Sequence, residues 1–125
     1  MPNTISGPCT STQKMFAWNR GVETITGMKT VDFSKVKTFS EMFCECYKLA
    51  NVDFNITNWV SSVATNLSSM FLSCKELDLS QLGDFTTWDV SNITNFSYCF
   101  GKTKTTTFDL SGWDMSKAQK IDGMF

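Results

Sequence analysis

The sequence predicts an α/β repeat solenoid of about 4.5 coils, each with 25–29 residues, one short strand and one short helix. Three observations predict this fold. A Met-Phe or Cys-Phe pair recurs along the chain, a 13-residue block ending in that pair recurs without insertions, and a short alternating stretch precedes each block. One such unit cannot bury its own apolar face, so stacked units are expected to share a continuous core.

The recurring pair sets the length of the repeat. Its phenylalanines are 27, 28, 29 and 25 residues apart; they are Phe16, Phe43, Phe71, Phe100 and Phe125. Residues 31–125 follow the repeat and stop in the middle of a unit. Residues 1–30 match it only through Met15-Phe16 and the stretch around Met28. We therefore interpret residues 1–30 as a degenerate first coil or an N-terminal cap.

Each 13-residue block is predicted to form a helix of about two turns. Apolar residues at its sixth, ninth and last positions are separated by steps of three and four, which fit one face of a helix. The fourth position is always serine, which can accept hydrogen bonds from the first turn as an N-cap. These serines are Ser34, Ser62, Ser91 and Ser116.

The stretches before the blocks, residues 26–30, 54–58, 83–87 and 108–112, are predicted to be brief strands because polar and apolar residues alternate there. On stacked coils, their polar residues form columns across the sheet. The columns are Asn55, Asp84 and Asp109, and Thr57, Thr86 and Ser111. We predict a partner-binding strand face here; the alternatives are a merely solvated face and, with little support, a calcium site.

Composition argues against several classes of function. Eleven Lys and Arg balance 12 Asp and Glu, so the net charge of −1 leaves no basic excess for nucleic acid. The chain has no histidine, no glycine-rich phosphate loop and no nucleophile elbow. Asp89 and Asp114 recur with the coil, which is typical of a fold requirement. We expect no enzyme, no cofactor and no metal site.

Five cysteines, an odd number, are interpreted as buried thiols, with a redox pair of Cys46 and Cys74 as the alternative. Trp59, Trp88 and Trp113 stand at the first position of successive blocks. They favour a buried aromatic spine over a stacking platform for sugars or bases. Four N-glycosylation sequons begin at Asn55, Asn66, Asn92 and Asn95. A chain this rich in Ser and Thr should contain roughly two by chance, so four is weak evidence for glycosylation.

The pattern Phe-x-x-Cys-x-x-Leu, followed by Asp-Leu-Ser-x-Trp-Asp-x-Ser, resembles the BspA-like leucine-rich repeats, the bacterial surface protein repeats of unknown function. Residues 71–77, 88–96 and 109–116 carry the resemblance. It implies a leucine-rich-repeat-like solenoid of the kind found in bacterial surface proteins, adhesins and large DNA viruses, with no catalytic residues. Residues 101–107 depart from the pattern because they lack its Cys and Leu.

Two hypotheses for function remain open. The first is a non-catalytic surface module for protein–protein interaction or adhesion, with the strand face as the contact. The second is a structural component of a large assembly such as a viral capsid or fibre. Met115, Ile121, Met124 and Phe125 are predicted to form an uncapped interface, covered by another chain or by a continuation of the repeat. We expect a cell-surface or extracellular location, or a virion, although the sequence contains no signal peptide and no membrane span.

Overall fold

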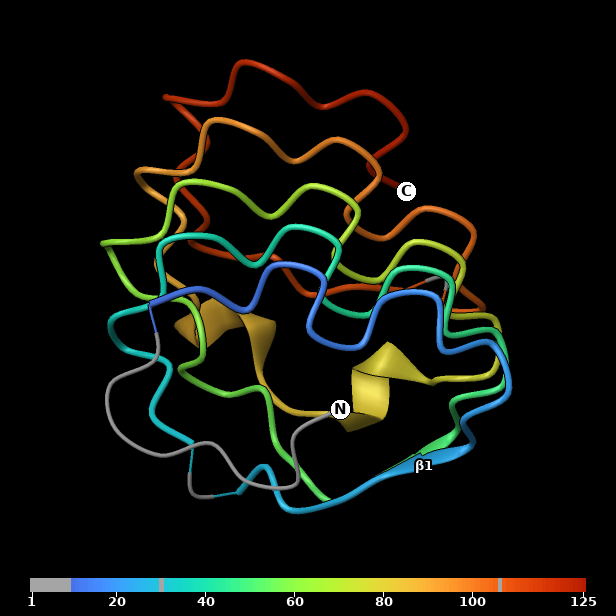
Figure 1. Cartoon of the computed structure of the whole chain (residues 1–125). Helices are drawn as coiled ribbons and strands as arrows, with labels where there is room; N and C mark the ends of the chain where they lie inside the picture. Colours follow the sequence, from blue (N-terminus) through green and yellow to red (C-terminus); the bar gives the residue numbers. More distant parts are fainter. Residues whose placement is uncertain (1–9, 30, 106) are drawn as a thin grey trace.

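The computed structural model describes residues 10–29, 31–105 and 107–125. The backbone of these residues runs through windings stacked in parallel register (Figure 1), and we call each winding a coil. Isolated parallel bridges connect one residue of each coil to its equivalent in the next. In the first to fifth coils, these residues are Ser11, Thr38, Asn66, Asn95 and Lys120. From Thr38 onward, each is the eighth residue of its block, so one sequence repeat corresponds to one coil.

Regular secondary structure is sparse. Strands β1 (Thr24–Ile25) and β2 (Asn51–Val52) pair in parallel, Thr24 with Asn51 and Ile25 with Val52. Two 3₁₀ helices follow, η1 (Leu79–Gln81) and η2 (Phe85–Thr87). The described residues contain no α-helix. The strands lie just before two of the predicted strand positions, and η2 occupies part of a third.

The blocks form ladders of turns instead of the predicted short helices. In the second coil, the N–H groups of Phe39, Glu41 and Phe43 donate to carbonyls of the third coil, at 2.8–2.9 Å. The N–H groups of Met42 and Cys44 donate three residues back within their own coil. An α-helix would direct every N–H group four residues back along its own axis. Turns leave alternate N–H groups free to connect the coils.

The first four turn ladders each contain non-glycine residues at positive φ, two residues before and two residues after their phenylalanine. The first set is Lys14, Glu41, Ser69 and Tyr98, and the second is Trp18, Glu45, Ser73 and Lys102. In the fifth coil, Gly123 takes the first of these positions with φ 59°. This backbone conformation costs roughly 1–2 kcal/mol for each non-glycine residue. The hydrogen bonds between coils, repeated four times, offset that cost.

The core is a continuous stack whose centre is one aromatic column. We call this the Phe column, Phe16, Phe43, Phe71, Phe100 and Phe125. Successive rings lie 5.5, 5.3, 6.2 and 5.9 Å apart between centroids, and their planes differ by 18° or less. Offset stacking at such distances is a favourable arrangement for aromatic rings. The column connects all five coils through side chains, just as the turn ladders connect them through the backbone.

Candidate functional site

The six residues of the predicted partner-binding face lie on turns and on η2, not on a strand, so we call them the turn face: Asn55, Thr57, Asp84, Thr86, Asp109 and Ser111. Four of them are exposed, whereas Thr57 and Thr86 are half-buried. Their period-two alternation reflects a turn motif, because a polar residue at one position bonds to the backbone two residues on.

The turn motif is an Asx turn. The N–H of Thr57 donates to Asn55 Oδ1 at 2.8 Å, and the N–H of Thr86 donates to Asp84 Oδ1 at 2.9 Å. The N–H of Ser111 donates to Asp109 Oδ1 at 3.0 Å. One acceptor atom of each Asx residue is thus used within its own coil. The remaining oxygen or amide group of each is left for solvent or a partner.

The same turn recurs outside the turn face. It joins Asx and Ser residues two apart in six further places: Asp32–Ser34, Asn66–Ser68, Asp78–Ser80, Asp89–Ser91, Asn95–Ser97 and Asp114–Ser116. In these turns the serine donates its N–H. The predicted N-cap role of Ser34, Ser62, Ser91 and Ser116 is wrong, because no helix follows any of them. Three of the four sequons, those at Asn55, Asn66 and Asn95, begin in such turns. The Asx turn therefore explains why an asparagine is followed two residues later by Ser or Thr at these places.

These turns lower the pKa of their carboxyl groups. The serine two residues on lowers the pKa, chiefly through its hydroxyl, at five positions: Asp32, Asp78, Asp89, Asp109 and Asp114. An acid whose folded pKa lies below its unfolded value of about 3.9 stabilises the fold at higher pH. That contribution is lost as the pH falls through the folded pKa.

We therefore expect the urea midpoint of unfolding to be flat above about pH 5 and to fall as the pH drops below about 4. Replacing Asp89 by Asn keeps the Oδ1 acceptor and should reduce the acid dependence, while Asp89→Ala should lower the midpoint at neutral pH as well. Chemical denaturation of the three chains at pH 3 and pH 7 checks this. Equal midpoints for the Asn and Ala variants at pH 7 would contradict the role of the turn.

The four described cysteines, Cys44, Cys46, Cys74 and Cys99, are free and buried, and Cys9 lies outside the described residues. The thiols of Cys46 and Cys74 each donate to a carbonyl of the preceding coil, Phe16 O and Phe43 O, at 3.1 Å. Burial raises the pKa of Cys44 and Cys46 to about 11, and it raises the pKa of Cys74 and Cys99 as well. Reactive thiols instead have a lowered pKa, because the thiolate is the nucleophile.

We expect a Cys9→Ser chain to react with a thiol reagent at pH 8 only as fast as it unfolds. Absorbance with an aromatic disulfide reagent measures this, and the same chain in denaturant, where all four thiols should react at once, is the control. Fast labelling of Cys46 or Cys74 in native buffer would contradict the buried-thiol interpretation and favour the redox pair.

Two of the three block tryptophans are hydrogen-bonded to the preceding coil. Trp59 and Trp88 are buried and Trp113 is half-buried, with the rings of Trp88 and Trp113 stacked 6.1 Å apart. The indole N–H of Trp88 donates to Ile56 O and that of Trp113 to Phe85 O, both at 2.8 Å. This arrangement agrees with an aromatic spine.

The four residues of the predicted apolar interface do not share one environment. Ile121 and Phe125 are 58% and 66% exposed, and Met115 is half-buried. Met124 points into the core and is buried, so it is not part of an exposed surface. The reason is the turn ladder, which directs the residue before each phenylalanine inward. Phe125 also borders an open pocket of about 520 Å³ with Phe100, Phe108 and Leu110.

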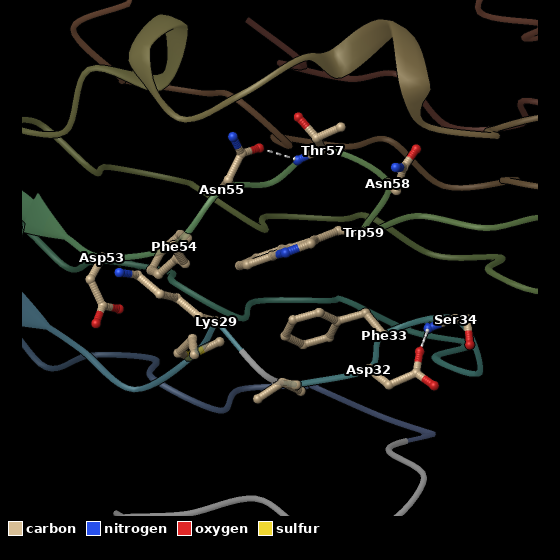
Figure 2. A pocket seen from close by; sticks show the side chains of 12 residues that line it. Lys29, Asp32, Phe33, Ser34, Asp53, Phe54, Asn55, Thr57, Asn58 and Trp59 are labelled. Carbon is tan, nitrogen blue, oxygen red and sulfur yellow. Dashed lines mark hydrogen bonds between the residues drawn. The ribbon is translucent and has the colours of Figure 1, made fainter.

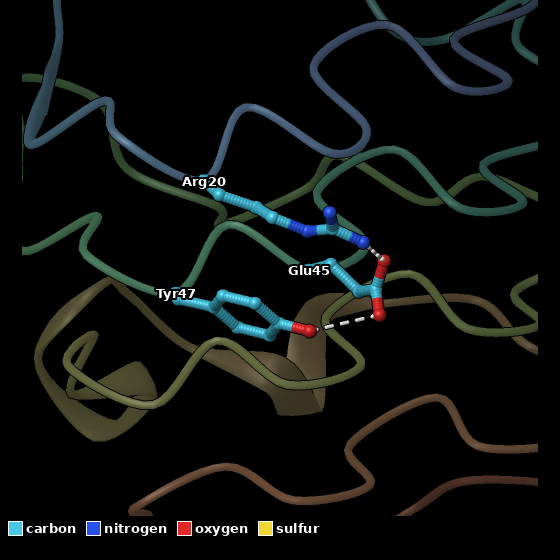
Figure 3. Close-up of polar contacts among 3 residues, drawn as sticks. All are labelled: Arg20, Glu45 and Tyr47. Carbon is cyan, nitrogen blue, oxygen red and sulfur yellow. Dashed lines mark hydrogen bonds and ion pairs between the residues drawn. The ribbon is translucent and has the colours of Figure 1, made fainter.

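A polar cluster joins the turns that follow the Phe column (Figure 3). Arg20 pairs with Glu45 at 2.9 Å, and the hydroxyl of Tyr47 donates to the other oxygen of that carboxylate, also at 2.9 Å. Hydrogen bonds from Arg20 and Tyr47 lower the pKa of Glu45. Arg20 and Lys75 also lie over the ring of Tyr47. Arg20, Tyr47 and Lys75 each lie four residues after a phenylalanine of the column, a signal that sequence reasoning could have used.

A pocket of about 640 Å³ opens between the second and third coils (Figure 2). Its lining includes Asn55 and Thr57 of the turn face, but most of it was not predicted. In the described part of the chain, this pocket included, no group of three or more acidic, Cys or His side chains could hold a metal ion. No helix among the described residues is long and apolar enough to cross a membrane.

The comparison that assigns a family covers nearly all of the chain. A family model described as "Mycoplasma protein of unknown function, DUF285" matches residues 10–125. The chain belongs to this family. No curated protein and no solved structure matches it. The match begins at the first described residue and spans all five coils, so the region predicted to be a degenerate first coil or cap is largely part of the family domain.

Proposed function

We propose that this chain is a BspA-like, leucine-rich-repeat-like solenoid that acts as a non-catalytic surface module for protein–protein interaction or adhesion. The observation that carries the proposal is the turn face, where equivalent polar side chains recur from coil to coil. Stacked repeats of this kind create extended surfaces used for binding. Membership of the DUF285 family supports the resemblance to bacterial surface repeats without assigning an activity.

The chemistry of the turn face suits a polar protein surface. Each Asx turn fixes its side chain with a hydrogen bond of 2.8–3.0 Å to the backbone two residues on. A partner would therefore meet side chains that are already ordered, which lowers the entropic cost of binding. Asp84 and Asp109 add negative charge, so the partner should present donors or cations.

The test is a charge change that keeps the turns intact. The variant Asp84→Asn/Asp109→Asn removes both negative charges of the turn face while every Asx acceptor remains. The matched control carries Asp89→Asn and Asp114→Asn in equivalent turns outside it. Adhesion of labelled protein to intact host cells and to purified extracellular matrix proteins should fall at least about tenfold in the first variant and stay unchanged in the control. Equal adhesion by both would refute the turn face as the contact.

The alternative function is a structural role in a larger assembly. The exposed side chains of Ile121 and Phe125 favour it, because apolar surface of this kind is often covered by a neighbouring subunit. Light scattering of the purified chain distinguishes the two proposals. A particle much larger than 14.1 kDa that is lost in Ile121→Ser/Phe125→Ser would support the structural role, whereas a monomer that still adheres to cells would support the surface module.

A further inference from the structure

The pocket between the second and third coils lies where the series of tryptophans at the first block position is interrupted. The first block position is tryptophan in the third, fourth and fifth coils, but in the second coil it is Val31. The smaller side chain leaves space beside Trp59, which Phe33 fills in part, with ring centroids 4.4 Å apart. The remaining space is the 640 Å³ pocket, a size typical of small-molecule sites.

The interruption also removes a hydrogen bond. In the fourth and fifth coils, the indole N–H donates to a carbonyl of the preceding coil, three residues before that coil's first block position. The equivalent acceptor for Trp59 is Met28 O. Among residues 10–29, 31–105 and 107–125, Trp59 Nε1 has no hydrogen-bond partner, although the residue is only 6% exposed.

The indole N–H of Trp59 is unpaired but not fully enclosed by protein. No fully buried side-chain nitrogen or oxygen in the described chain lacks a partner, so Nε1 must reach open space, and Trp59 lines this pocket. A donor held in an almost buried ring is ready to bind without a further ordering cost. In Figure 2, the rings of Trp59 and Phe33 lie next to each other, between Asp53 on one side and Asp32 on the other.

The polar lining carries donors and acceptors with a small negative charge. Asp32 and Asp53 supply two carboxylates against the single ammonium of Lys29, so an anionic ligand is disfavoured. Asn55 and Asn58 add amide groups that can donate and accept. A hydroxyl group also does both, and a polyol ring presents several of them around an apolar face.

We propose that this pocket binds a neutral saccharide of one or two rings, held mainly by hydrogen bonds because the rings of Trp59 and Phe33 are almost buried against each other. The indole N–H of Trp59 donates to a ring or hydroxyl oxygen, and Asp32 and Asp53 accept from sugar hydroxyls. The proposal does not depend on protein binding by the turn face, because the charge change at Asp84 and Asp109 leaves the pocket lining untouched.

The four indole N–H signals in a ¹H–¹⁵N spectrum provide the test. The signals of Trp88 and Trp113 should exchange slowly with solvent and that of Trp59 rapidly, since only the first two are bonded to carbonyls. The probes are methyl glucoside, galactoside and mannoside, N-acetylglucosamine, maltose, cellobiose and lactose. We expect at least one of them to shift the Trp59 signal with millimolar affinity and to leave that of Trp113 unmoved.

The variant Trp59→Phe keeps an aromatic side chain but removes the indole donor, and it should weaken binding of that sugar at least about fivefold, as followed on the backbone signals of Phe33 and Asp53. Trp113→Phe, the same substitution two coils away, should bind normally, and glucuronate should bind more weakly than its neutral counterpart. Absence of any shift up to about 50 mM sugar would overturn the proposal, because the affinity would then be too weak for a built site. Unchanged affinity in Trp59→Phe would also overturn it, as would tighter binding of glucuronate.

Discussion

Phe71→Ala should destabilise the protein by about 3–5 kcal/mol, which is a large part of the stability of an ordinary domain. Phe71 is fully buried at the middle of the Phe column and stacks on Phe43 at 5.3 Å and on Phe100 at 6.2 Å. Its removal leaves a cavity between the third coil and both of its neighbours. Because each coil contacts only the next, no other side chain can replace the lost contacts.

The matched control is the same substitution at the last ring of the same column. Phe125 is 66% exposed and stacks on one ring of the column, that of Phe100, with Phe108 tilted against it at 5.7 Å. Phe125→Ala should cost about 1 kcal/mol or less. Urea unfolding followed by circular dichroism measures both. Similar losses for the two variants would show that the column does not carry the stability of the stack.

The sequence predicts the repeat and its buried positions because side-chain type follows burial. The sixth and ninth block positions are predicted to face inward, and in the first three blocks these side chains are fully buried. In the last block Ala118 is half-buried and Ile121 is 58% exposed, so the prediction is wrong there. The spacing of the Met-Phe pairs also predicts which residues stack. These predictions depend only on the period of apolar residues, which any coil of this length must respect.

The period of the apolar residues does not distinguish a short helix from a ladder of turns. A ladder of overlapping turns also brings apolar side chains inward at steps of three and four. The decisive feature is the alternation of N–H groups between turn bonds and bonds to the next coil, and it requires positive φ at residues such as Glu41 and Ser69. Glycine or asparagine at these positions would have indicated a positive φ, whereas glutamate and serine do not.

The pocket beside Trp59 was missed for a different reason. Val31 fits the repeat as an apolar residue at the first block position, but its side chain is smaller than the tryptophan of the later blocks and leaves the space open. An exception in a repeat is as informative as the repeat itself. The repeat places the six residues of the turn face in columns, but it does not show that they lie on turns. Strands and successive Asx turns both alternate at period two, so the pattern does not distinguish them.

A second large effect is expected at Gly83, where the third and fourth coils meet. Its φ is +144°, a region that L side chains rarely adopt. A Cβ atom there would lie 2.8 Å from Thr57 Oγ1 and 3.0 Å from the Thr57 nitrogen, and it would overlap Asn55 Oδ1. The neighbouring N–H of Asp84 donates to Thr57 Oγ1 at 3.0 Å. The close approach and this hydrogen bond therefore hold the Asx turn that begins at Asp84 against Thr57 of the neighbouring coil.

Gly83→Ala should cost about 2–4 kcal/mol, because it combines backbone strain of about 1–3 kcal/mol with a steric clash. Two other glycines separate these contributions. Gly112 has φ +80° and open space around it, so Gly112→Ala should cost about 1 kcal/mol from the backbone alone. Gly21 has neither positive φ nor a close neighbour, and Gly21→Ala should be neutral or stabilising by about 0.5 kcal/mol.

Thermal and urea unfolding of the three alanine variants should therefore rank the losses as Gly83, then Gly112, then Gly21. Adding Asn55→Ala removes the side chain that the new Cβ overlaps, so it should cost less in the Gly83→Ala background than in the wild type. Additive losses in that double-mutant cycle would mean that the clash with Asn55 is relieved by movement of the coil. In that case the contact at Gly83 would not fix the register between the third and fourth coils.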